Sequence, residues 1–409
     1  MKRFSIMIFL PVLLSFTACK NVKESTLFIP LISNTSSTDT SASTGQTTIN
    51  LGSSVTATDP ETIPPVLSGN IQFDQVTLSA STNYTLGTAV SANSAFVVCT
   101  FQTSSSSVEN TPSCQLSSDG TQVQVSKNGG SSVNVNYSVL NFSSGMTVQR
   151  GSSTFTAGTA QATLTTAVNT ARSFLVLSTR TSETTSASDA RRLVRGVITN
   201  STTLDFTCYQ CTNTSTVEWQ VVQWNASSVI TNSLTIADGN SSGTATLPSS
   251  VDLTKSFLIS NYTYTTGANV GFEDNYMLHG RFSSSSELTF QRGSSAGSLN
   301  IQYYVVSVSS GISVKSNSYS LTDTQLTLCD TIPSSGVTNY LKTMLIASNR
   351  IGNEGPSVSN FDSGSIRYAF GVAGCGSLGN THISMTRHTL GEGSPNHTIS
   401  GSYFLIEFN

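Results

Sequence analysis

The sequence predicts an all-β protein: tandem small antiparallel β-sandwich units of five or six strands each, placed after a disordered tether. Valine, threonine and aromatic residues alternate with polar ones on a period of two, which favours half-buried strands. Such runs recur every ~8–15 residues between short polar turns, as in sandwiches and barrels. The strand pattern also repeats along the chain, and a repeat at a nearly fixed interval indicates duplicated units.

The clearest repeat is a strand that places an aromatic residue among aliphatic ones. Its aromatics lie 82, 84 and 100 residues apart. They are Tyr137, Trp219, Tyr303 and Tyr403, and their strands continue in step to Phe142, Trp224, Val308 and Phe408. A second repeated strand, opened by Ser or Thr, carries Phe96, Phe174, Phe257 and Met344.

These landmarks recur in one order and divide the chain into four copies. We predict β-sandwich units at 67–143 (shortened), 144–226, 227–309 and 310–409. The third copy shows six strands, at 229–236, 244–247, 256–263, 276–282, 287–291 and 299–308. Residues 165–172 are the best candidate for a turn of helix. The copies could be separate beads or could share a core.

The amino end, residues 1–18, has the pattern of a lipoprotein signal peptide. A positive start is followed by an apolar run at 6–16, too short to span a membrane, and then by Cys19. This pattern resembles a bacterial lipobox, and with Phe16 in place of the usual leucine it resembles the leptospiral surface lipoproteins. The resemblance implies a protein anchored in the bacterial outer membrane through acylated Cys19 and exposed at the surface. The alternative is an ordinary secretory signal with an incidental cysteine.

Residues 19–66 form a Ser/Thr-rich segment with little to bury apart from 27–32, so we expect a disordered tether. A coil of this length spans about 35–40 Å, from ~5–6 Å times the square root of its residue count. Such a tether lifts folded units away from a membrane.

Charged residues make up only 10% of the chain, and the formal net charge is −3. Globular domains usually contain about 25% charged residues. Nucleic-acid binding needs clustered lysine and arginine to displace counterions from phosphate, so the composition argues against a nucleic-acid partner.

Six cysteines follow Cys19, an even number that predicts disulfides in an exported chain. They group by copy as Cys99 with Cys114, Cys208 with Cys211, and Cys329 with Cys375. Each pair is expected to staple loops within its own unit. The CxxC at 208–211 could instead be a redox pair or half a zinc site, but zinc needs two more ligands and a redox CxxC usually opens a helix. A structural disulfide is the preferred interpretation.

A third repeated feature is an aspartate four residues before an aliphatic. The positions are Asp189, Asp274 and Asp362. They are either Asx-turn caps or ligand positions on exposed loops. Calcium needs six to eight oxygens, and only Glu273 beside Asp274 adds acidity. We prefer the structural turn and keep ligand binding as the alternative.

The two tryptophans, Trp219 and Trp224, lie five positions apart on one strand and therefore point to opposite faces. Packing of both in the core is the favoured interpretation. Trp224 is the candidate for an exposed ring that stacks on a ligand.

Three of the four histidines fall in the last copy, but their spacing is not that of a helical zinc site. Adjacent carboxylates such as Glu273 and Asp274 point to opposite faces of a strand and make a poor acid–base pair. No nucleophile elbow, P-loop or dinucleotide fingerprint occurs in its required setting. We therefore expect neither an enzyme nor a resident metal or cofactor.

The order of strands within each copy resembles the H-type lectin domain. In the third copy the matching segments are 282–290 and 299–308, whose last strand carries an aromatic and paired aliphatics. The resemblance implies a six-stranded sandwich, a possible oligomer and binding of galactose-type sugars. No binding motif of that family matches residue by residue, so no sugar contact is carried over.

Together these observations predict an adhesin or recognition protein for a glycan or host macromolecule. The alternative is a structural spacer or coat protein without a specific small ligand. Exposed aromatics grouped beside polar loops in one copy would favour recognition, whereas aromatics buried in every copy would favour the spacer.

Overall fold

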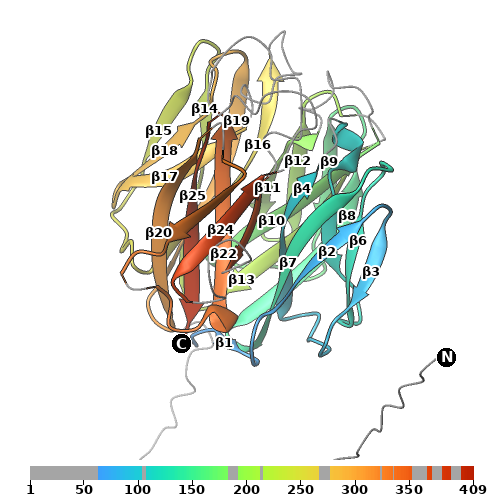
Figure 1. Cartoon of the computed structure of the whole chain (residues 1–409), viewed down its shortest axis with the longest axis vertical. Coiled ribbons are helices and arrows are strands. Elements are labelled where there is room, and N and C mark those ends of the chain that lie inside the picture. The colour runs from blue at the N-terminus through green and yellow to red at the C-terminus, as the bar shows by residue number, and fades with distance from the viewer. Residues whose placement is uncertain are drawn as a thin grey trace, which may run out of the picture. The chain divides into compact units, whose positions relative to one another are not determined.

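The structure is a computed structural model. It describes residues 63–103, 107–182, 192–211, 215–266, 277–322, 325–334, 336–351, 366–370, 380–387 and 398–409. These residues fall within one compact unit, 57–409. The fold is all-β and consists of tandem antiparallel sandwich units, as predicted (Figure 1). Within the described residues, no helix is long and apolar enough to cross a membrane.

Each unit has six main strands in two three-stranded sheets. Unit 3 contains β14 Ser227–Ile236, β15 Ser242–Thr246, β16 Ser256–Thr266, β17 His279–Ser284, β18 Glu287–Gln291 and β19 Ser298–Val308. Its first, sixth and third strands form what we call the long sheet, in the order β14-β19-β16. Its second, fifth and fourth strands form the short sheet, β15-β18-β17. All six predicted runs of this copy are strands.

The other units repeat this topology. Unit 1 contains β1 Val66–Leu67, β2 Gln72–Leu78, β3 Thr82–Thr85, β4 Ala95–Thr103, β5 Ser113–Leu116, β6 Gln122–Ser126 and β7 Val133–Ser144. Unit 2 contains β8 Met146–Thr154, β9 Thr159–Thr163, β10 Ser173–Thr181, β11 Val194–Asn200, β12 Thr203–Cys208 and β13 Ser215–Trp224. Unit 4 contains β20 Ile312–Leu321, β21 Thr327–Thr331, β22 Thr343–Ile351, β23 Ile366–Phe370, β24 His382–Arg387 and β25 Ile399–Phe408.

Unit 1 has fewer residues than the others but all six strands. Its additional strand β1 pairs with the end of β7 beyond β2. The predicted shortening therefore removes no strand. The predicted turn of helix is a short 3-10 turn, η3 Thr170–Arg172, and the same kind of turn occurs at η2 Val108–Asn110 and η5 Tyr340–Lys342.

The middle strands of the long sheets of units 2, 3 and 4 are buried on both faces, whereas β7 of unit 1 alternates between buried and half-buried residues. Along β25, residues 401–408 are all buried, and β13 and β19 each have an uninterrupted buried stretch of six residues. Such continuous buried runs, which include a few polar residues, occur where a strand is covered on both sides. One face of each long sheet packs on the short sheet of its own unit, and the other face contacts neighbouring units.

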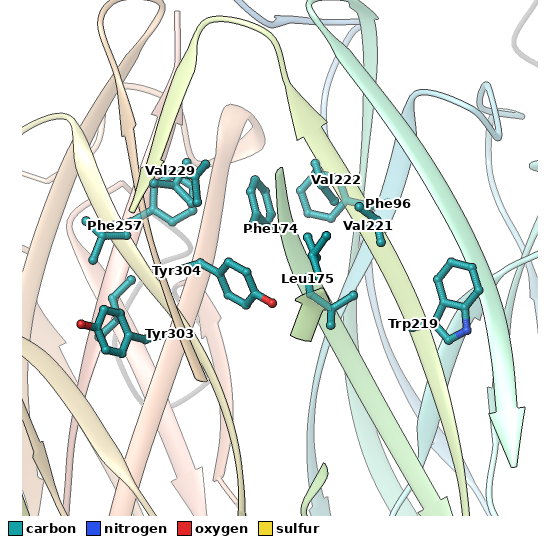
Figure 2. Close-up of a cluster of buried hydrophobic side chains, with 14 of the residues drawn as sticks. Phe96, Phe174, Leu175, Trp219, Val221, Val222, Val229, Phe257, Tyr303 and Tyr304 are labelled. Carbon is teal, nitrogen blue, oxygen red and sulfur yellow. The ribbon is translucent and has the colours of Figure 1, made fainter. Parts of the chain in front are cut away.

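A shared aromatic cluster joins the four units. Phe174 of unit 2 contacts the ring of Phe96 in unit 1 and that of Phe257 in unit 3, with ring centroids 6.4 and 6.1 Å apart (Figure 2). Trp224 contacts rings of the other three units. These rings are Phe142 at 6.4 Å, Phe257 at 6.0 Å and Phe408 at 5.8 Å. The aromatics near the ends of the repeated strands, Phe142, Trp224 and Phe408, therefore meet in one cluster. The copies share a core and do not form separate beads.

The units contact one another in a closed cyclic order through one repeated hydrogen bond. In each case the fourth strand of one unit donates a backbone N–H to a polar side chain on the third strand of the next. The bonds are Cys114 N to Ser178 Oγ (2.9 Å), Gly196 N to Asn261 Oδ1 (2.8 Å), Gly280 N to Ser348 Oγ (3.1 Å) and Tyr368 N to Thr100 Oγ1 (3.5 Å). The fourth bond joins unit 4 back to unit 1. Because this head-to-tail arrangement closes into a ring, every unit uses both of its contact surfaces and none is left unpaired.

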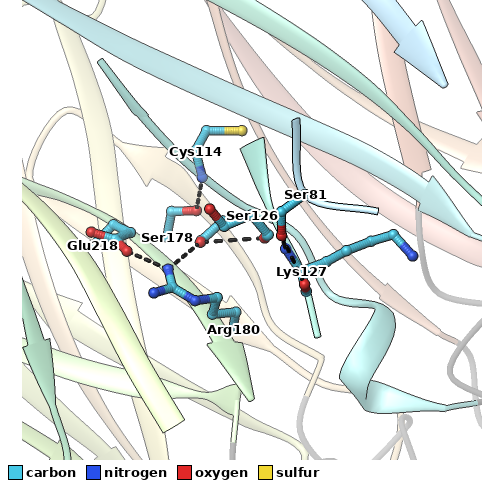
Figure 3. A network of polar contacts seen from close by, with 8 residues as sticks. Ser81, Cys114, Ser126, Lys127, Ser178, Arg180 and Glu218 are labelled. Carbon is cyan, nitrogen blue, oxygen red and sulfur yellow. Dashed lines mark hydrogen bonds and ion pairs between the residues drawn. The ribbon is translucent and has the colours of Figure 1, made fainter. Parts of the chain in front are cut away.

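Further polar contacts reinforce the interface between units 1 and 2. Arg180 of β10 donates to Ser113 Oγ of β5 (3.0 Å) and forms an ion pair with Glu218 on β13 (Figure 3). Glu218 is only 7% exposed, so Arg180 keeps a buried carboxylate from being unpaired.

Disulfides link Cys99 to Cys114 and Cys208 to Cys211, with Cα atoms 6.4 and 5.5 Å apart. The second closes the turn after β12. The first joins β4 of the long sheet to β5 of the short sheet, so it ties the two sheets of unit 1 together and does not staple loops as expected.

Candidate functional site

The three aspartates singled out by the repeat, Asp189, Asp274 and Asp362, lie outside the described residues. So do Cys375, His388 and His397. Cys329 is disulfide-bonded. Within the part of the chain that the structure describes, no three His, Cys, Asp or Glu side chains gather in a way that could hold a metal ion.

Trp224 is not an exposed ligand platform, and this candidate role is wrong. Its side chain is 0% exposed and lies in the shared aromatic cluster. Trp219 is also buried, at 7% exposed. The two rings do point to opposite faces, but neighbouring units cover the second face of the long sheet. Both tryptophans are therefore core residues.

The best candidate site is a cavity of about 290 Å³ at the interface between unit 4 and unit 1, which we call the seam pocket. Its lining comes from the long sheet of unit 1 and from β22 and β23 of unit 4. The residues are Phe73, Asp74, Gln75, Val98, Thr100, Asn136, Tyr137, Ser138, Leu345, Tyr368, Ala369 and Phe370. This volume is at the small end of ligand pockets, which hold ~300–1,000 Å³, and suits a single ring-sized group.

The seam pocket exists because Ser138 stands where the other units have a large side chain. The residue after the repeated aromatic is Gln220 in unit 2, Tyr304 in unit 3 and Phe404 in unit 4. Each of these three reaches the preceding unit. The contacts are Gln220 Nε2 to Val97 O (2.8 Å), Tyr304 OH to Gly196 O (3.3 Å), and Phe404 to the ring of Phe282 (centroids 5.8 Å apart). A serine is too short to fill the same space between units 4 and 1.

Aromatic side chains stand together beside the seam pocket. Phe73 is 43% exposed, although large apolar side chains usually lie inside. Its ring centroid lies 5.8 Å from that of Tyr340 on η5, which in turn lies 6.2 Å from that of Phe370 on β23. Tyr340 and Phe370 are half-buried. Phe73 also lines a second cavity of about 390 Å³, so its ring is accessible from two sides.

The polar groups of the pocket wall are mostly neutral. Strand alternation puts Gln75 and Asn136 on the same face of the long sheet as Phe73 and Ser138. Asn136 donates its amide to Tyr368 O (2.8 Å), while its Oδ1 is buried without a hydrogen-bond partner in the described structure. Apolar walls with an amide and a hydroxyl suit a ligand that has an apolar face and a hydroxyl-bearing edge.

Asp74 and Tyr137 lie opposite each other on the other face of this sheet. Burial, and to a smaller extent the nearby charge of Asp74, raise the pKa of Tyr137 to about 12. The phenol is therefore neutral at physiological pH.

Ser138, Phe73 and Tyr340 were not among the site residues predicted from the sequence. A signal for Ser138 was present, because aligning the four aromatic strands puts one small residue among three large ones. Phe73 carried no such signal, because its exposure depends on how unit 4 meets unit 1.

No known family model matches the chain, and a search of curated proteins finds no match either.

Proposed function

We propose that this protein is a lipid-anchored surface recognition protein, an adhesin that binds a neutral glycan in the seam pocket. The observation that carries the proposal is the group of accessible rings beside a cavity at one interface between repeats. A pyranose ring presents an apolar face, which packs on an aromatic ring, and an edge of hydroxyls, which pair with side-chain amides. Gln75 and Asn136 supply such amides beside Phe73.

The anchor in this proposal is Cys19, in the bacterial outer membrane. Labelling with a radioactive fatty acid should mark the wild-type chain and leave a Cys19→Ala variant unmarked.

The recognition role is tested by screening the full chain on a glycan array. Phe73→Ala and Ser138→Tyr should each weaken binding of the best glycan at least ten-fold, the first by removing a stacking surface and the second by filling the cavity. Leu253→Ala is the matched control, since Leu253 is a comparably exposed apolar residue (39%) in unit 3. Unfolding midpoints would establish that each variant is folded.

A structural spacer or coat protein is the second candidate function. The burial of both tryptophans and the closed cycle of interfaces favour it, because they make a compact unit with few exposed aromatics. A wild-type chain that binds no glycan, or binding lost equally in Leu253→Ala, would reject the seam-pocket adhesin in favour of the spacer.

A further inference from the structure

A second locus, between units 3 and 4, brings two arginines and a buried histidine together, and no carboxylate of the described residues pairs with them. His279 and Arg281 lie two positions apart on β17 and so share one face of that strand. Arg350 lies on β22 of unit 4. Gly280, which lies between His279 and Arg281, donates its N–H to Ser348 Oγ (3.1 Å), two positions before Arg350 on the same face of β22. Arg350 itself donates to Arg292 O (3.4 Å), next to Gln291, the residue opposite His279 on β18. The three side chains therefore lie at one place, and the charges of Arg281 and Arg350 add to burial in lowering the pKa of His279.

Four buried nitrogen atoms at this locus lack a hydrogen-bond partner in the described structure. They are Nδ1 and Nε2 of His279, Nε of Arg281 and Nε of Arg350. His279 is only 4% exposed, whereas Arg281 and Arg350 are half-buried and can be reached from solvent. A neutral histidine has one N–H donor, so three of these four nitrogens are donors. An unpaired buried donor costs about 1–3 kcal/mol, so three of them in one place indicate a missing acceptor.

The repeat shows what kind of acceptor is missing. At the interface between units 1 and 2, Arg180 occupies the position of Arg350, and it pairs with the carboxylate of Glu218. Ser402 stands in place of Glu218 in unit 4, and its hydroxyl donates to Gly280 O (2.8 Å). Unit 4 therefore has the arginine, Arg350, but lacks the carboxylate that pairs with the corresponding arginine in unit 2.

Another charged group close to this locus among the described residues, Arg292, has its own hydrogen-bond partners. Arg292, which follows β18, donates to the carbonyls of Asn240, Ala296 and Gly297 among others, and its side chain is fully buried. Arg350 donates to Arg292 O (3.4 Å) with one terminal nitrogen, leaving the rest of its guanidinium for a ligand. Among the described residues the ion pair found is Arg180–Glu218, so no described carboxylate neutralises the cluster.

We infer that His279, Arg281 and Arg350 form a binding site for a tetrahedral oxyanion, a sulfate or phosphate group, at the interface between units 3 and 4. Guanidinium groups bind such oxygens through paired charge-assisted hydrogen bonds. Neutral His279 supplies one N–H donor from the buried side. The anion takes the place that the Glu218 carboxylate holds in unit 2. The site lies apart from the seam pocket and does not rest on the glycan proposal.

The test is a calorimetric titration of the full chain with inorganic phosphate and with sulfate at constant ionic strength in chloride. Saturable binding is expected, and Arg281→Gln and Arg350→Gln should each weaken it at least ten-fold. Arg367→Gln is the matched control, a half-buried arginine on the equivalent strand of unit 4. Ser402→Glu supplies the missing carboxylate and should abolish anion binding while leaving the chain folded. A sulfated monosaccharide that binds much more tightly than free sulfate would identify an ester as the natural source.

A second readout needs no substitution in the site. The chain has four histidines, so the imidazole resonance of His279 can be assigned by replacing the other three in turn. The pKa of His279 is about 4 without an anion, lowered first by burial. A bound anion favours the protonated ring, so sulfate, whose charge does not change in this pH range, should raise that pKa, and sulfate binding should tighten as the pH falls. An unchanged His279 titration, non-saturable binding, or equal weakening by Arg367→Gln would overturn the inference.

Discussion

Replacing Trp224 with alanine should weaken the whole assembly of units rather than unit 2 alone. The side chain is 0% exposed and contacts one ring in each of the other three units. Truncating a buried tryptophan to alanine costs about 3–5 kcal/mol. Each aromatic pair contributes about 0.5–1.5 kcal/mol beyond burial, and three such pairs are lost here. We therefore expect a loss of about 5 kcal/mol, the size of the entire unfolding free energy of many domains.

The assay is urea unfolding, followed both by far-UV circular dichroism and by the fluorescence of the remaining tryptophan, Trp219. Trp224→Phe retains a ring in the cluster and should lose less than half as much. Trp219→Ala is the matched control. It removes a buried ring that faces the short sheet of unit 2, so it should destabilise that unit without loosening contacts between units. A Trp224→Ala variant within about 1 kcal/mol of wild type would refute the argument that the shared cluster holds the units together.

Three further predictions concern the interfaces, the disulfide and the tyrosines. Asn261→Ala should lower the unfolding free energy by about 1–3 kcal/mol, because it leaves the Gly196 N–H buried without an acceptor; Asn261→Asp keeps an acceptor oxygen and should restore part of the loss on thermal unfolding. Replacing Cys99 and Cys114 together by serine should cost about 3 kcal/mol, the chain-entropy value for a loop of 15 residues, and an unchanged urea midpoint would contradict it. The free energy of unfolding should fall as the pH rises from about 10 to 12. The reason is that tyrosines of the unfolded chain lose their protons near pH 10, whereas the pKa of Tyr137 in the folded protein is about 12. Between pH 9 and 11, the urea midpoint should therefore drop less for Tyr137→Phe than for wild type.

The strands and their order along the chain could be predicted from the sequence because both depend on local periodicity. Alternation assigns each residue of a strand to one of two faces, and Trp219 and Trp224 do lie on opposite faces. It does not say what covers each face. The candidate role of Trp224 as an exposed ring was wrong because the second face of the long sheet packs against other units. That arrangement is long-range, and no local pattern encodes it.

The candidate sites show the same division. Ser138 and Ser402 are ordinary serines in the sequence, and each becomes informative only when its strand is aligned with the others and the interface it faces is known. Ser138 then stands where the other units have a side chain that contacts the preceding unit. Ser402 stands where unit 2 has the carboxylate that would pair with Arg350.

By itself the sequence determined that this chain is all-β, that one sandwich unit is repeated along it, and which residues alternate towards a core, because side-chain spacing along a strand is a local property. Only the tertiary structure decided that the four units close on one another around a shared aromatic cluster. It also decided where that closure leaves a cavity and where it leaves unpaired positive charge. Those outcomes depend on which side chains meet across the interfaces, between residues that lie far apart in the sequence.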